Sequence, residues 1–516
     1  MMKRTTRTAL LLLALLMFVG LNCFAAIKVQ VNAVGSTGMF QTMALGAYSS
    51  SSCGTNMWSK KSGASGVDSR RGDIPLQTAN IWIVWDNAKT KVCAYLGTDS
   101  IIGQQLFFAV PRATLSIPSS EIGSSGDNLI PTVTDVPLDV DVYNALNNLT
   151  FNAAPTDVRP EDAFFQAQRV IAPLDPVNYN GLGYTGDGQV GTTILSAFSS
   201  KSVTPVAYAI SGKDPISGGT VKAFTTTPVG ADPIVVFVNT QDTAAGGFGT
   251  SSFNNVSRFQ LTAALNGTFT RTRDLSNVPG LPSIGMQVIL REPMSGTYTT
   301  AEFNIPRDFE IHSTQELNVD PNQPGGNPLN IVYASGGSRR RGMGTGEVVA
   351  EVGSIPDAIG YSFWSTGNFA KVLTTTKYLS VDGVDPLNYS WYQTHGTIPN
   401  CVIPCKGLVP FVNILNGSYP AWTILRVVTD VPVPAGVAAL IKAAQTSAIN
   451  VSPDFVPVKN LQVFRSHFPQ AGFAPSNGNP GEPTESGGDV GGAVYTVQGD
   501  KDYFNDTALQ IVGQKQ

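Results

Sequence analysis

The stretch Met286-Gln-Val-Ile-Leu-Arg291-Glu-Pro-Met-Ser295-Gly296-Thr297 joins a short apolar run to a turn and a helix start. The apolar run is typical of a buried strand, and Ser295-Gly296-Thr297 predicts the first turn of a helix. A helix N-terminus presents unpaired N–H groups and a partial positive charge, which suit an oxyanion. Gly296 allows close backbone approach, Ser295 and Thr297 supply hydroxyl groups, and Arg291 supplies a planar charged fork. One interpretation of the stretch is therefore an anion site.

A simpler interpretation of the same residues stays open at this point. Ser295 can serve only as the N-cap of the helix, and Arg291 can be an ordinary surface arginine. The stretch by itself favours neither interpretation, so the rest of the chain has to decide between them.

Strand-like runs bounded by turn residues recur along the whole chain. They lie at Ile27–Val31, Ile81–Trp85, Val92–Leu96, Ile234–Val238, Met286–Leu290, Ile359–Phe363 and Trp422–Val428. Several of these runs lead into segments with helical spacing, at Gly38–Tyr48, Asn255–Leu265, Thr345–Val352 and Gly436–Ala444. Alternation of strands and helices over this length predicts an α/β fold with mixed sheets flanked by helices.

Composition supports a folded, loop-rich protein. Of the 516 residues, 42% are hydrophobic and 14% are charged, which is the reverse of a disordered composition. The 52 glycines and 34 prolines indicate many turns and loop-rich insertions. After the first ~26 residues no apolar run reaches the roughly 18 residues of a membrane helix, so an integral membrane protein is not expected.

The first residues have the features of a signal peptide. Three basic residues open the chain, at Lys3, Arg4 and Arg7, and an apolar stretch without acids follows over 9–21. Small residues near Ala25 and Ala26 suit cleavage there, so residues 1–26 are expected to be removed on export to the periplasm or the medium. The remainder carries 30 basic and 37 acidic side chains, a formal charge of −7. Such a chain has no general attraction for nucleic acid.

Cysteine usage fits an exported protein. Lipid anchoring at Cys23 is the less favoured alternative to cleavage, because Asn22 precedes it where a lipoprotein signal has a small residue. Four cysteines remain, and an even number in an exported chain favours disulfides. Since Cys401 and Cys405 would close a tight loop, the expected pairs are Cys401–Cys405 and Cys53–Cys93.

Signatures of metal or enzyme chemistry are not evident. The histidines His312, His395 and His467 lack the ligand spacing of a zinc site, and no nucleophile elbow or Walker loop occurs. We expect no metal, no cofactor and no catalytic residue. Arg339-Arg340-Arg341 is interpreted as a solvated loop, and the glycines of Gly342-x-Gly344-x-Gly346 as a flexible turn.

Beyond these features, the chain resembles the periplasmic phosphate-binding proteins of ABC uptake transporters. Arg291-x-x-x-Ser295-Gly296-Thr297 after a strand is similar to the anion-binding core of that family. Five further segments resemble family motifs in the same order: Gly35-Ser36-Thr37-Gly38, Tyr95-x-Gly97-x-x-Ser100-x-x-Gly103, Phe151 to Asp157, Pro233 to Asn239, and Pro356-Asp-Ala-Ile-Gly360-Tyr361. Glu292 and Pro293 depart from the family pattern, which often has an aspartate in this turn.

The resemblance implies a type II periplasmic-binding fold with two α/β lobes, two hinge crossings and long insertions. Residues 27–232 would form lobe 1, 233–418 lobe 2, and 419–516 would return to lobe 1 with a flexible C-terminal extension. The phosphate ligands would be Ser36, Thr37, Gly38, Ser100, Asp157, Arg291, Ser295, Gly296 and Thr297. The protein would be a monomer that binds inorganic phosphate and docks on an ABC transporter permease in the inner membrane.

Two other classes of function are kept as alternatives. The Gly/Ser-rich insertions are also compatible with a secreted structural or adhesive surface protein, which predicts no tight anion site. A secreted phosphatase would need a metal cluster or a nucleophile.

Overall fold

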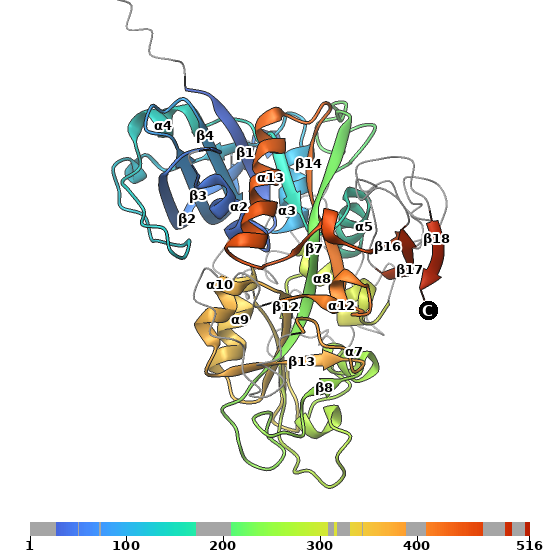
Figure 1. Cartoon of the computed structure of the whole chain (residues 1–516). Coiled ribbons are helices and arrows are strands. Elements are labelled where there is room, and N and C mark those ends of the chain that lie inside the picture. Colours follow the sequence, from blue (N-terminus) through green and yellow to red (C-terminus); the bar gives the residue numbers. More distant parts are fainter. Residues whose placement is uncertain are drawn as a thin grey trace, which may run out of the picture.

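A computed structural model describes residues 27–49, 51–71, 74–171, 208–307, 314–316, 331–342, 344–388, 409–467, 491–497 and 511–515. In this part of the chain, one 15-stranded mixed sheet with helices on its faces forms the body of the molecule (Figure 1). The main path runs β10-β11-β9-β12-β7-β14-β6-β1-β4-β3-β2-β5. The mixed α/β architecture expected from the alternating pattern is therefore confirmed.

The strands of this sheet are β1 (Val29–Gly35), β2 (Asn56–Asp68), β3 (Ile74–Trp85), β4 (Val92–Gly97), β5 (Thr114–Ser116), β6 (Ala153–Thr156), β7 (Phe224–Asn239), β8 (Asn255–Val256), β9 (Gln287–Arg291), β10 (Ile331–Val332), β11 (Ser338–Gly342), β12 (Ala358–Phe363), β13 (Thr376–Val381), β14 (Trp422–Asp430) and β15 (Val456–Pro457). A separate small sheet contains β16 (Val463–His467), β17 (Gly491–Val497) and β18 (Ile511–Lys515).

The α-helices are α2 (Phe40–Ala47), α3 (Ser100–Phe108), α4 (Val140–Leu146), α5 (Pro160–Ile171), α7 (Arg258–Leu265), α8 (Gly296–Asn304), α9 (Gly344–Ser354), α10 (Thr366–Phe369), α12 (Val412–Leu415) and α13 (Ala435–Asn450). They cover both faces of the sheet, and α13 packs beside α2 (Figure 1). Gly46 of α2 makes this approach possible, because a Cβ there would lie 2.6 Å from the Ala444 nitrogen.

Strand β7 is the element that two groups of strands share. Its first ten residues pair with β14, and Ile234–Val238 pair antiparallel with β12. We call the group of β1 to β6 with β14 the β1 part, and the group of β8 to β13 the β9 part. The boundary predicted at 232/233 falls inside β7, and the chain leaves the β9 part again just before β14. One long strand thus ties the two parts into one sheet.

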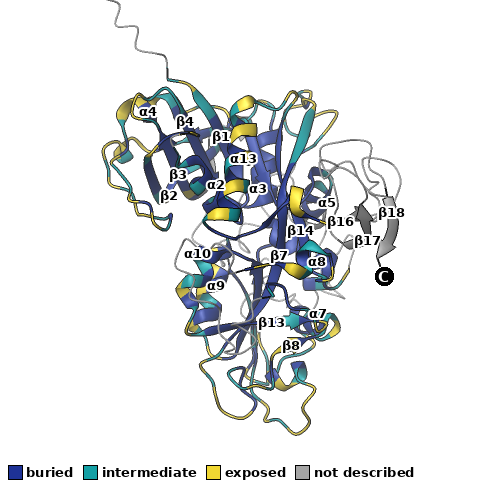
Figure 2. Cartoon of the chain, viewed as in Figure 1, coloured by how far each residue is buried: buried dark blue, intermediate teal, exposed yellow. Residues whose placement is uncertain are grey.

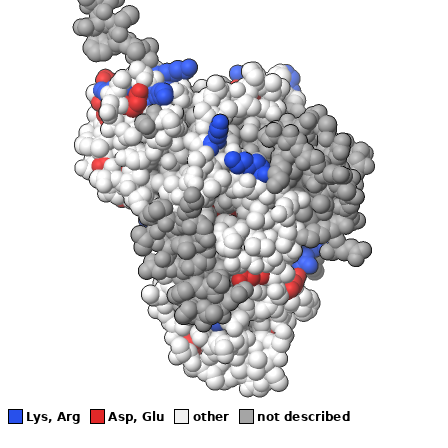
Figure 3. Space-filling view, viewed as in Figure 1, with Lys and Arg blue, Asp and Glu red and all other residues white. Residues whose placement is uncertain are grey.

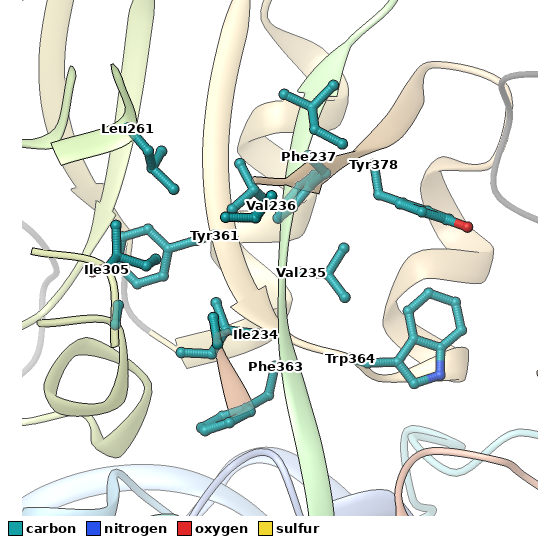
Figure 4. Packing of buried hydrophobic residues seen from close by; sticks show 14 of the residues in the cluster. Ile234, Val235, Val236, Phe237, Leu261, Ile305, Tyr361, Phe363, Trp364 and Tyr378 are labelled. Carbon is teal, nitrogen blue, oxygen red and sulfur yellow. The ribbon is translucent and has the colours of Figure 1, made fainter. Parts of the chain in front are cut away.

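Apolar side chains on both faces of β7 form the core of the β9 part. Val235 lies on the side of Trp364 and Tyr378, whereas Ile234 lies on the side of Phe363 (Figure 4). All five are at most 1% exposed. Since side chains alternate along a strand, a strand with such residues on both faces must be covered on both. This accounts for the continuous apolar run by which the sequence predicted it.

Burial follows the same layers in the β1 part. Two further apolar clusters lie against its sheet, one toward α3 and α4 and the other toward α2 and α13. Helix residues that face the sheet are buried, in dark blue, and those on the outer faces are exposed, in yellow (Figure 2). Charged residues of the described chain lie scattered on the visible surface, without a continuous basic patch there (Figure 3).

Two expectations for polar segments were wrong. The residues Arg339-Arg340-Arg341 do not form a solvated loop but lie within β11, where Arg339 is fully buried and Arg341 is 3% exposed. The glycines from Gly342 to Gly346 end β11 and begin α9. A basic run in Gly-rich sequence is typical of an exposed loop, but here the strand pairs in parallel with β9. Arg339 and Arg341 are thereby buried, whereas the Arg340 side chain is 34% exposed. Strand β2 was missed, because its Lys, Ser and Gly residues have low strand propensity.

A disulfide joins Cys53 to Cys93, one of the two expected pairs. Cys93 lies in β4 and Cys53 just before β2, so the bond ties the loop after α2 to the sheet. The other expected pair, Cys401–Cys405, lies outside the described residues.

Peptide mapping of the oxidised protein should recover Cys53–Cys93 and Cys401–Cys405 as two separate linked peptides. The reason is export into an oxidising compartment with an even number of mature cysteines. Free thiols, or a cross-link between one cysteine of each pair, would contradict this assignment.

Candidate functional site

The candidate site lies where the carboxyl ends of strands from both parts meet. In the β1 part, β1, β4 and β6 are parallel neighbours, and Ser36, Ser100 and Asp157 follow them. In the β9 part, β9 and β11 are parallel and lead into α8 and α9. The ends of parallel strands, where helices begin, are the usual place for ligands in α/β sheets. The sequence motifs therefore converge because the topology brings these strand ends together.

Asp157 is the acid at the centre of the site. It is 3% exposed, and its Oδ1 accepts a hydrogen bond from the Ser36 hydroxyl. The Asp157 N–H donates to the Ser100 hydroxyl oxygen at 3.2 Å. Burial raises the pKa of Asp157 to about 6, although the hydrogen bonds from the two serines lower it. Near neutral pH the group is mostly an anion that can only accept hydrogen bonds.

Two glycines bring the backbone close to this carboxylate. A Cβ on Gly296 would lie 2.7 Å from both Asp157 Oδ2 and Ser100 Oγ. Gly38 also approaches, since its Cβ would lie 3.6 Å from Asp157 Oδ1, and its N–H donates to Ser36 Oγ at 3.1 Å. Only glycine at 296 therefore permits the observed approach of α8 to the β1 part.

Arg291 is fully buried, and all five of its N–H groups donate hydrogen bonds to protein oxygens. The Nε and Nη2 groups donate to the two carboxylate oxygens of Glu292 at 3.1 and 2.8 Å. Nη2 also donates to Asp99 Oδ1 at 3.1 Å. Nη1 donates to the hydroxyl oxygens of Thr297 at 3.0 Å and Thr345 at 3.2 Å. Arg291 is thus a buried hub and not a surface arginine.

The charges of Arg291 and Glu292 stabilise each other. Burial opposes ionisation of both groups, but the Glu292 carboxylate raises the pKa of Arg291 above its ordinary value. Conversely, despite burial, the Arg291 guanidinium lowers the pKa of Glu292 below its ordinary value. The pairing therefore favours the charged form of each group, so that neither charge is left alone in the interior.

The start of α8 contains Ser295 as its N-cap. The Ser295 hydroxyl accepts from the Thr297 N–H at 3.1 Å, which is the capping role that the simpler interpretation gave it. Thr297 accepts from Arg291 and keeps its own hydroxyl proton for donation. The Thr299 N–H donates to the Ser295 carbonyl oxygen at 3.2 Å and begins the helical hydrogen bonds.

The start of α9 adds a second helix N-terminus. The sequence predicted helical spacing from Thr345 onward but interpreted the surrounding glycines as a flexible turn. The Gly344 N–H donates to Glu292 Oε2 at 3.2 Å. The Thr345 hydroxyl lies 3.4 Å from that of Thr37, which follows β1. Thr345 and Thr37 thereby connect the β9 part to the β1 part.

All nine residues predicted as ligands lie in this one network: Ser36, Thr37, Gly38, Ser100, Asp157, Arg291, Ser295, Gly296 and Thr297. Three members, Asp99, Glu292 and Thr345, were not predicted as site residues. Asp99 stands inside the Tyr95–Gly103 motif and Glu292 next to Arg291, so position alone could have indicated them. Glu292 was noted only as a departure from the family pattern, and Asp99 was only an unnamed position inside its motif.

The described residues contain no group of three or more His, Cys, Asp or Glu side chains placed to hold a metal ion. None of the helices found among them has the length and apolar character needed to cross a membrane.

No protein-family model and no curated protein matches the sequence. Among solved structures, a periplasmic phosphate-binding protein (PfluDING) bound with phosphate is similar at 12% identity and TM-score 0.36, covering 83% of this chain and 90% of that chain. A phosphate-binding protein from Stenotrophomonas maltophilia is similar at 13% identity and TM-score 0.28, covering 58% and 70%. An ABC-type phosphate transport receptor from Vibrio cholerae is similar at 13% identity and TM-score 0.26, covering 45% and 72%. The likeness is distant and concerns the fold alone.

Replacing Gly296 by alanine should destabilise the protein by roughly 1–3 kcal/mol, because the new methyl group must push Asp157 or Ser100 away. Gly38→Ala is the matched control, since its methyl group would make ordinary contacts at 3.4 and 3.6 Å. In urea unfolding, the midpoint concentration should be clearly lower for Gly296→Ala than for wild type. It should be nearly unchanged for Gly38→Ala. Equal midpoints for Gly296→Ala and wild type would contradict the described close approach.

Proposed function

We propose that the protein binds inorganic phosphate at the junction of its two parts, outside the cytoplasm, and delivers it to an ABC transporter permease. The observation that carries the proposal is the Asp157 carboxylate. It is buried among two serine hydroxyls and Gly296, at a point where strand ends and helix N-termini converge. The proposal does not depend on the distant likeness in fold.

The donors around Asp157 suit an oxyanion. Ser36, Ser100 and Thr297 have hydroxyl groups that can rotate to donate, and each is at most 1% exposed. The first turns of α3 and α8 supply backbone N–H groups and the positive ends of the helix dipoles. In a buried site such dipoles act more strongly than in water, so a dehydrated anion can be held without many cations.

Asp157 explains why the oxyanion would be phosphate. Near neutral pH phosphate still carries a proton that it can donate to the carboxylate, whereas sulfate is fully ionised and has none. Sulfate would place an unpaired oxygen against an anionic acceptor in a dry site. Such a mismatch costs several kcal/mol and discriminates strongly against the wrong ligand.

Arg291 would act mainly through its position and charge. Because all five donors are engaged, the anion can meet Arg291 only if a protein oxygen gives way. The Thr297 and Thr345 hydroxyls accept from Nη1, and each can donate its own proton to the ligand. Arg291 thus fixes two hydroxyl groups for the anion and offsets part of the acidic charge.

Delivery requires that the two parts open and close. The predicted crossings are β7 and the segment that enters β14, and site residues come from both parts. A ligand that contacts both parts would favour the closed arrangement, which a permease can recognise. Uptake of labelled phosphate by cells that lack this chain, with and without the chain restored, tests the transport step.

Asp157→Asn should lower phosphate affinity roughly 10- to 100-fold, because a charge-assisted hydrogen bond contributes about 1.5–3 kcal/mol. Isothermal titration calorimetry with inorganic phosphate measures the effect. Asp454→Asn is the control, as Asp454 is also buried but bonds the Thr42 hydroxyl and the Thr366 N–H, neither of which is a proposed ligand group. If wild type and Asp157→Asn bind phosphate with equal affinity, Asp157 is not a phosphate ligand.

Sulfate binding by the wild type should appear only as the pH falls through about 6, where Asp157 gains a proton and can donate it. Above that pKa the protonated fraction falls tenfold per pH unit, so sulfate affinity should fall from pH 6 to 8 by up to about 100-fold. In Asp157→Asn, whose amide donates at every pH, sulfate affinity should be nearly constant. Sulfate affinity of the wild type that stays flat over this range would contradict the selector role.

The alternative of a secreted structural or adhesive protein makes the opposite prediction. Phosphate at 100 times its Kd should add about 2.7 kcal/mol to the free energy of unfolding of a binding protein. A thermal melt that phosphate, arsenate and phosphonate all leave unchanged would favour the structural alternative.

A further inference from the structure

Asp99 stands at the N-cap position of α3, yet its side chain makes no capping hydrogen bond. Aspartate at an N-cap normally accepts from the first-turn N–H groups, and that contact is worth about 1 kcal/mol. Asp139 shows the ordinary behaviour in this chain, as its carboxylate accepts from the Asp141 and Val142 N–H groups at the start of α4. The Asp99 carboxylate therefore does not serve as a helix cap, and its contacts lie elsewhere.

Asp99 instead makes a contact between the β1 part and the β9 part. Asp99 Oδ1 lies 3.1 Å from Arg291 Nη2, and the two side chains are 3% and 0% exposed. Asp99 comes from the β1 part and Arg291 from the β9 part. Next to this contact the Ile101 N–H donates to the Met294 carbonyl at 3.3 Å, so α3 and the turn before α8 touch through main chain as well.

Asp99 occupies an N–H group of Arg291 that could otherwise bind an oxyanion. A guanidinium binds carboxylates and phosphates with the same N–H groups and in the same geometry. Of the two carboxylates on Arg291, Glu292 is bound more firmly than Asp99. Both of its oxygens accept from Arg291, and Oε2 also accepts from the Gly344 N–H. Asp99 makes one contact with Arg291, so it is the carboxylate that an incoming anion can replace at lower cost.

Charge adds to this competition. Arg291 is surrounded by Asp99, Glu292 and, in the same network, Asp157, and Asp99 also hydrogen-bonds Glu292. The bond between two carboxyl groups requires that they share one proton. Even so, the acids together balance or exceed the single positive charge, and a further anion enters against them.

We propose that Asp99 is an internal competitor for the oxyanion. It occupies one N–H of Arg291 and joins the two parts, and it thereby sets a lower ligand affinity than the remaining groups would give. This inference rests on the proposed function, because it assumes that the competing ligand is an oxyanion such as phosphate.

Asp99→Ser tests the competitor role, since serine is a good N-cap for α3 but does not extend to Arg291. The variant frees one charge-assisted donor, so its affinity for inorganic phosphate by calorimetry should rise roughly 10- to 100-fold. In phosphate-free buffer its radius of gyration by small-angle X-ray scattering should exceed that of wild type. Asp139→Ser, at the N-cap of α4, should change neither quantity. If Asp99→Ser does not fold, Asp99→Asn should show a smaller gain, because its amide oxygen still accepts but carries no charge.

The outcomes separate the inference from the proposed function. If the wild type binds phosphate and neither Asp99 variant binds more tightly, the competitor role is wrong while the proposed function stands. If the Asp99 variants bind phosphate and the wild type does not, the competitor role is supported in its strongest form. If none of these proteins binds phosphate at millimolar concentration, the proposed function fails and the competitor role fails with it.

Discussion

The buried guanidinium of Arg291 organises the junction on which the rest of the structure depends. It ends β9, and its donors reach Glu292 in the next position, Thr297 in α8, Thr345 in α9 and Asp99 before α3. A buried charge is tolerated only when its partners are fixed around it, so these contacts define where the two helices start relative to β9. They also fix the distance between the β1 and β9 parts, since Asp99 and Arg291 come from different parts.

A second constraint acts a few ångströms away, where Gly296 meets Asp157 and Ser100. The absence of a side chain at Gly296 lets the positive end of α8 approach a carboxylate without an intervening methyl group. A buried carboxylate with a pKa of about 6 is poised between accepting and donating a hydrogen bond. The site therefore combines a fixed positive hub with an acid whose protonation can distinguish one oxyanion from another.

Much of this arrangement could be predicted from the sequence. Buried strands such as β7, β9, β12 and β14 show as apolar runs, so the mixed α/β fold follows from local pattern. The strand before the helix start at Ser295 indicated Arg291 and Ser295 to Thr297 as candidate ligands. The other predicted ligands came from the resemblance to phosphate-binding proteins. The acids Asp99 and Glu292 and the arginines of β11 could not be placed in this way. Their burial depends on partners distant in the sequence, as when Arg291 binds Asp99 across 192 positions. Strand β2 of the long β2–β3 hairpin was missed for a related reason, because its pairing with β3 compensates for weak local propensity.

A crystal structure of the protein grown with saturating inorganic phosphate tests the central claim most directly. The account predicts a tetrahedral anion within hydrogen-bonding distance of an Asp157 carboxylate oxygen, contacted by Ser36 and Ser100 from the β1 part and by the first turn of α8 from the β9 part. Such contacts would show that the junction is a phosphate site shared by both parts. An anion bound elsewhere, or a junction that stays unchanged at saturating phosphate with Gly296 still against Asp157, would contradict the account.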